Sequence, residues 1–83
     1  MTAPDWLTAR TGGLAKGING HNLVVTVDGE PLWRLEAVPA RGQFTCAIVE
    51  TNNGRRLDAG KEYPTREAAL AGGLEELRAR LGW

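Results

Sequence analysis

The chain has 83 residues, and its ten Lys or Arg balance ten Asp or Glu, so its formal net charge at pH 7 is zero. Balanced charge gives no general attraction to nucleic acid or to an anionic membrane surface. Hydrophobic residues make up 42% of the chain, a share that excludes a disordered protein and is enough for a folded core. The length fits one small domain over residues 1–83.

Cysteine content and the first residues bear on the compartment. Cys46 is the only cysteine, so an internal disulfide and a zinc cluster of cysteines are both excluded. The opening "MTAPDWLTAR" lacks the apolar run of a signal peptide, and no apolar stretch is long enough to cross a membrane. We therefore expect a cytoplasmic protein without a cofactor, and Gly82-Trp83 reads as a natural end to its last helix.

Residues 1–21 form a glycine-rich N-terminal segment. Trp6 and Leu7 predict either a short strand or a lid on the core. Closely spaced glycines then predict an irregular loop over residues 11–22, at Gly12, Gly13, Gly17 and Gly20.

The glycines of this loop do not fit a phosphate-binding motif. Gly13 and Gly17 enclose three residues instead of four, Lys16 precedes the second glycine, and a strand follows in place of a helix. His21 has no identifiable partner for acid–base chemistry, which favours an ordinary loop histidine. A small-ligand site at this loop is therefore only the third of the functional hypotheses.

Residues 22–61 have the pattern of an antiparallel β-meander. Short β-branched and aromatic runs predict strands at 22–28, 32–38 and 43–50, with a weaker fourth strand at 55–60. Asp28-Gly29 is a strong hairpin signal, and turns are also expected at 39–42 and 52–54. The chain is therefore predicted to be an α+β protein with an antiparallel sheet of three to five strands and one C-terminal helix packed on one face.

Alternation along these strands separates two faces of the sheet. One face is apolar, with Leu23, Val25, Val27, Trp33, Leu35, Ala37, Phe44, Cys46 and Ile48. The other is mixed, with Val24, Thr26, Leu32, Arg34, Glu36, Val38, Thr45, Ala47 and Val49. Either the apolar residues of the mixed face form an interface, or the N-terminal segment covers them with Trp6, Leu7, Leu14 and Ile18.

The last element is a helix over residues 65–81. Thr65 is the expected N-cap, and Gly82 is expected to end the helix in a left-handed conformation. Leucines at helical spacing predict a single stripe that faces the core, at Leu70, Leu74, Leu77 and Leu81. Two glycines in mid-helix cost roughly 1 kcal/mol each. Gly73 borders the stripe and could admit a close approach to the sheet. For Gly72 a tolerated surface glycine is favoured, and the alternative is that it marks where another group approaches the outer face of the helix.

The C-terminal half resembles two DNA-binding families. Its sheet-then-helix order resembles the APETALA-type domain and the arm-binding domains of tyrosine recombinases. The matching residues stand at the helix start: Tyr63, Thr65, Glu67, Ala68 and Ala69. The resemblance implies a sheet-plus-helix fold and contact with DNA through the sheet. Basic and aromatic side chains make that contact in those families, whereas this third strand offers Thr45, Ala47 and Val49.

No residue pattern indicates catalysis. Cys46 alternates with Phe44 and Ile48, which predicts a small core residue and not a nucleophile. We therefore expect a non-enzymatic module that binds a protein partner or a second copy of itself through the mixed face. The candidate residues of this interface are Val24, Leu32, Arg34, Val38 and Val49. The alternative is a sheet-based nucleic-acid-binding domain that uses Arg34, Arg41, Arg55 and Arg56.

Overall fold

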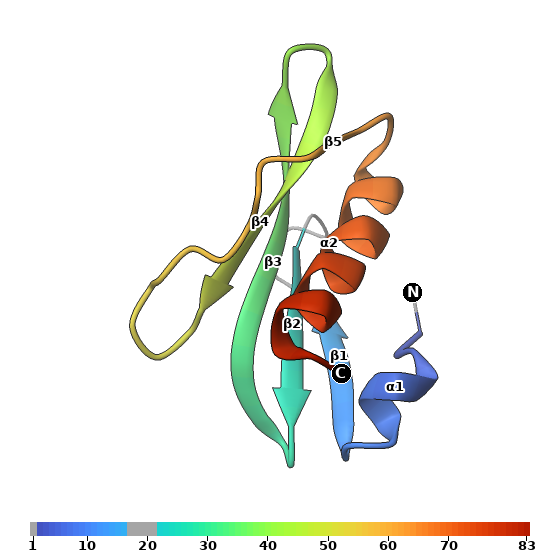
Figure 1. The fold of residues 1–83 in the computed structure, drawn as a ribbon, viewed down its shortest axis with the longest axis vertical. Helices are drawn as coiled ribbons and strands as arrows, with labels where there is room; N and C mark the ends of the chain where they lie inside the picture. The colour runs from blue at the N-terminus through green and yellow to red at the C-terminus, as the bar shows by residue number, and fades with distance from the viewer. Residues whose placement is uncertain (1, 17–21) are drawn as a thin grey trace.

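The protein is an α+β structure with a five-stranded antiparallel sheet and a long helix against one face, as the sequence predicts (Figure 1). The computed structural model describes residues 2–16 and 22–83. The elements are α1 (Asp5–Thr8), β1 (Gly12–Lys16), β2 (Asn22–Val27), β3 (Glu30–Ala40), β4 (Gln43–Glu50), β5 (Glu62–Tyr63) and α2 (Arg66–Leu81). The strands lie in chain order, which is a meander. Neither helix of the described ranges is long and apolar enough to cross a membrane.

Two tight hairpins set the register of the central strands. Asp28-Gly29 joins β2 to β3 with φ angles of 53° and 79°, and Arg41-Gly42 joins β3 to β4 with φ angles of 50° and 79°. Positive φ at both loop positions is the geometry of a type I′ turn, whose twist matches that of the strands. The Asp-Gly signal is therefore confirmed, and Arg41 occupies the same position in the second turn.

The predicted loop over 11–22 is wrong for residues 12–16, which form β1 at the edge of the sheet. Gly12 pairs with Val27 and Gly13 with Thr26, so both glycines are part of a regular ladder. A Cβ on Gly12 would meet the Leu7 side chain, which shows that the glycine makes room for α1. Residues 17–21 of this loop, with Ile18 and His21, lie outside the described residues.

The predicted fourth strand at 55–60 is also wrong. Only Arg56 bridges to β4, opposite Val49, and the fifth strand forms later, where Tyr63 pairs with Phe44. The Asp58 carboxylate interrupts the pairing, because its Oδ1 accepts the Ile48 N–H at 3.0 Å in place of a main-chain carbonyl.

Helix α2 begins and ends as the sequence predicts. The Thr65 hydroxyl accepts the Ala68 N–H at 3.0 Å, which caps the first turn. Gly82 is left-handed with φ 73°, its N–H donates to the Ala79 carbonyl, and the Trp83 N–H donates to the Arg78 carbonyl. These two bonds form a Schellman motif, which turns the chain back over the sheet.

The core lies between the sheet and the two helices. The sheet contributes Leu23, Val25, Leu35, Ala37, Cys46 and Ile48, α2 contributes Ala69, Leu70, Leu74 and Leu77, and α1 contributes Leu7. Leu81 of the predicted stripe is half-buried against this cluster. Each fully buried leucine stabilises the fold by about 1.5–3 kcal/mol, so helix and sheet are held together by this layer.

Helix α1 lies on the same side of the sheet as α2 (Figure 1). Its Trp6 ring lies 6.2 Å from that of Trp83, which in turn meets Trp33 edge-on at 5.8 Å. Leu7 is fully buried in the common core, and Leu14 of β1 packs against the same core. The N-terminal segment is therefore a lid on the core, and the hypothesis that Trp6, Leu7 and Leu14 cover the opposite face is wrong.

Candidate functional site

The mixed face of the sheet, opposite the two helices, is not covered by any element of residues 2–16 or 22–83. We call this surface the open face. It is formed by Val24, Thr26, Leu32, Arg34, Glu36, Val38, Thr45, Ala47 and Val49. Its side chains lie in rows across the strands, because Val24 pairs with Arg34 and Arg34 with Val49. None of its apolar side chains is among those that pack against the core. The open face is therefore a continuous surface that spans the three longest strands.

All five candidate interface residues lie on or beside these rows. Val24 and Val49 flank Arg34, and Val38 lies further along β3, opposite Thr45. Leu32 lies where the pairing of β2 and β3 shifts register, at a β-bulge. Val38 is 36% exposed, whereas the other three apolar residues are half-buried by their neighbours.

The open face also carries a basic and an acidic residue side by side. Arg34 and Glu36 are two residues apart on β3, so their Cα atoms are about 6.6 Å apart along one face. Arg34 is exposed and Glu36 is half-buried. Neither takes part in the ion pairs found among the described residues. Their charges remain available to a partner.

The four arginines of the nucleic-acid hypothesis do not form one cluster. Arg34 and Arg56 share the open face on either side of Val49. Arg41 lies on the β3–β4 turn, where its Nε donates to Glu62 at 2.9 Å. Arg55 lines a cavity beside α2, on the helix side of the sheet. The structure thus brings two of the four together and separates the others.

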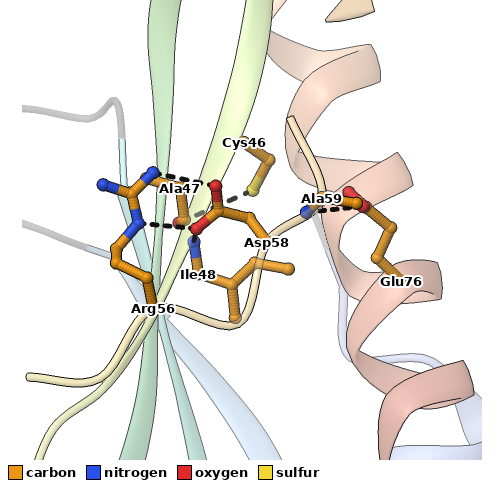
Figure 2. Close-up of polar contacts among 7 residues, drawn as sticks. All are labelled: Cys46, Ala47, Ile48, Arg56, Asp58, Ala59 and Glu76. Carbon is orange, nitrogen blue, oxygen red and sulfur yellow. Dashed lines mark hydrogen bonds and ion pairs between the residues drawn. The ribbon is translucent and has the colours of Figure 1, made fainter. Parts of the chain in front are cut away.

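Arg56 is itself held by a carboxylate (Figure 2). Its Nε and Nη2 donate to the two oxygens of Asp58 at 2.6 and 2.8 Å, a bidentate pair. These bonds lower the pKa of Asp58 to about 2. Because Asp58 also accepts the Ile48 N–H, the pair fixes the chain that follows β4 against the edge of the sheet.

Cys46 and Glu76 lie on the other side of this segment (Figure 2). Burial, together with the nearby carboxylates of Glu76 and Asp58, raises the pKa of Cys46 to about 12. The thiol is therefore protonated at neutral pH and is a small core group. Glu76 Oε1 accepts the Ala59 N–H at 3.4 Å, and its Oε2 is buried without a partner among the described residues. Burial and the Glu76 charge also raise the pKa of Tyr63.

Sequence reasoning missed Asp58, Glu76 and the cavity beside Arg55. Glu76 is half-buried, because the segment before β5 packs over it. No local pattern reveals such a contact between residues 17 apart in the chain. Within residues 2–16 and 22–83 no three His, Cys, Asp or Glu side chains are grouped so as to hold a metal ion.

Comparison with protein-family models, curated proteins and solved structures finds no match to this chain. The resemblance of the C-terminal half to the two DNA-binding families therefore stays a prediction.

Proposed function

We propose that the protein is a small non-enzymatic interaction module that forms a homodimer through the open face of its sheet. The observation that supports this function is the uncovered face, where the half-buried Val24 and Val49 flank Arg34 and where Glu36 follows on the same face of β3. Apolar surface left uncovered beside complementary charge is typical of protein interfaces.

A second copy suits this face because the charges are self-complementary. In a twofold interface the same residues meet in reciprocal fashion. An axis that passes between Arg34 and Glu36 places the arginine of each copy against the glutamate of the other. Both charges are then paired, and the valines on either side of them are buried.

The size of the face sets the expected affinity. Strands about 4.8 Å apart and about 20 Å long give the open face, which spans three strands, an area of roughly 300 Å² per copy. Two such faces bury roughly 600 Å², which is below the roughly 1,200 Å² at which stable interfaces begin. We therefore expect a weak dimer, with a dissociation constant of roughly 10–500 μM.

Charge reversal tests the reciprocal pairing. In Arg34→Glu, the new glutamate of each copy would meet Glu36 of the other copy. In Glu36→Arg, the new arginine would likewise meet Arg34. Both contacts are repulsive, so each variant alone should be monomeric. An equimolar mixture of the two variants should restore the dimer, and so should the double swap of both residues in one chain. Sedimentation equilibrium from about 10 μM to 1 mM measures these states.

Arg66→Glu is the matched control, because it reverses the same charge in the first turn of α2, on the helix side of the sheet. It should dimerise like the unchanged chain. A monomer at 1 mM for the unchanged chain refutes the proposal. So does a dimer that both single reversals leave intact.

The alternative function, nucleic-acid binding, is tested on the same protein by NMR. Duplex DNA added at low salt would shift the backbone amides of Arg34 and Arg56, and the shifts would vanish as salt rises. That result in a chain that stays monomeric would replace the dimer with a nucleic-acid-binding domain. We place either function in the cytoplasm, since the single cysteine is a buried thiol.

A further inference from the structure

A cavity of about 340 Å³ lies on the helix side of the sheet, away from the open face. Its wall has an apolar part from three elements, namely Trp33 of β3, Leu81 of α2 and Leu57 of the segment after β4. Two arginines line the same cavity, Arg55 from the turn after β4 and Arg80 from the last turn of α2. Residues distant in the sequence therefore line one open groove.

The two guanidinium groups are available to a ligand. Neither Arg55 nor Arg80 takes part in the side-chain ion pairs found among the described residues. The one carboxylate of the cavity wall, Glu50, already accepts the Asn53 amide at 3.2 Å. The cavity thus has two cations against one partly satisfied anion. Guanidinium groups bind carboxylate and phosphate oxygens in bidentate fashion.

A second cavity continues the first along α2. Leu57 and Arg80 line both spaces, and the second, also about 340 Å³, is completed by Ala59, Glu76 and Ala79. Each volume is at the lower end of those that hold small molecules in proteins, about 300–1,000 Å³. An apolar body therefore has room beside Trp33 and Leu57, away from the Glu76 carboxylate.

We propose that this groove is a binding site for a small organic oxyanion, whose apolar body packs on Trp33 and Leu57 and whose charged oxygens bind Arg55 and Arg80. Carboxylate and phosphate oxygens can both bind a pair of guanidinium groups, and two probe compounds distinguish which of the two anions the site prefers. The site is independent of the proposed dimer, because its residues lie on the helix side of the sheet.

Phenylacetate and phenyl phosphate are the two probes, titrated at constant ionic strength into the labelled full chain and followed by amide and indole NMR. The Trp33 indole signal, assigned with Trp33→Phe, should shift and saturate with a dissociation constant of roughly 1–10 mM, as expected for a ligand of about ten heavy atoms. The tighter of the two probes identifies the preferred anion. The indole of Trp6 serves as the internal reference, because the Trp83 ring contacts Trp33.

Three comparisons decide the result. Acetate, which lacks the apolar body, and phenethylamine, which carries the opposite charge, should each bind at least fivefold more weakly. Arg55→Gln and Arg80→Gln should each weaken the tighter probe about fivefold to tenfold, whereas Arg66→Gln should leave it unchanged. Shifts that do not saturate by 50 mM would overturn the proposal, as would equal binding of phenethylamine or equal effects of the three arginine variants.

Discussion

Two adjacent glycines show how a single residue decides the packing of α2. A Cβ on Gly73 would lie 2.8 Å from the Cys46 Cβ and 3.3 Å from Leu35 Cδ2, so the helix approaches β3 and β4 through its missing side chain. A Cβ on Gly72 would meet the Tyr63 ring. The prediction for Gly73 is confirmed, and the interpretation of Gly72 as a tolerated surface glycine is wrong because β5 places an aromatic ring on it.

Gly73→Ala should therefore destabilise the protein although alanine favours helices. The added methyl group meets the base of a core side chain, which costs about 1–3 kcal/mol and exceeds the helix gain of about 1 kcal/mol. Gly72→Ala should cost less, because the far end of Tyr63 can rotate away. Urea unfolding measures both, and exposed Ala71→Gly calibrates the helix term. A Gly73→Ala variant more stable than the unchanged chain would contradict the close approach.

At the scale of elements, α1 is short yet belongs to the core. It has only four residues and no side-chain cap, so its own hydrogen bonds contribute little. Leu7 is completely buried, and the Trp6 ring packs against Trp83. Arg10 lies over the Trp83 ring at 4.6 Å, a cation–π contact. The helix is thus held by tertiary contacts with the far end of the chain.

Leu7→Ala should cost about 3 kcal/mol, because it leaves a cavity in the common core. That is a large part of the roughly 5 kcal/mol expected for so small a domain. Leu7→Val should cost about 1 kcal/mol. Its unfolding can be measured even if the alanine variant does not fold. Exposed Thr8→Ala is the control on the same helix. Equal unfolding midpoints for Leu7→Ala and Thr8→Ala would show that α1 is not part of the cooperative fold.

At the scale of the whole molecule, the sheet separates two surfaces of different character. One side holds both helices, the core and the groove beside Arg55, and the other is the open face. The net charge of zero leaves no field of one sign over the molecule, so individual pairs govern its electrostatics. Of the described carboxylates, Asp58 has the most direct link to overall stability, because it joins Arg56 to the β4 edge.

The pH dependence of the free energy of unfolding should show this pair. The folded pKa of Asp58, about 2, lies below its unfolded value of about 3.9, so its contribution is present above about pH 4 and is lost as the pH falls towards 2. Asp58→Asn should cost about 1 kcal/mol at pH 7, since the arginine is largely exposed, and progressively less as the pH falls through the folded pKa of Asp58 near 2. Asp28→Asn, at an exposed turn, is the control. A cost for Asp58→Asn that does not decrease between pH 7 and pH 2 would assign the effect to packing.

Local sequence signals predicted the elements whose causes are local. The Asp28-Gly29 turn, the alternation along β2 to β4, the Thr65 cap and the Gly82 stop all act within a few residues. The five candidate interface residues were placed together by the same alternation. The prediction of a loop at residues 12–16 was wrong, because pairing with β2 overrides the weak strand preference of glycine.

The sequence by itself determined the α+β class, the meander and the leucine stripe of α2, because hydrophobic periodicity and turn chemistry are local properties. Only the tertiary structure decided which face the N-terminal segment covers and why Gly72 and Gly73 are glycines. It also decided that Arg55 and Arg80 line one groove while Arg34 lies on the opposite side. These features depend on contacts between residues far apart in the chain, which exist only after the helices pack on the sheet.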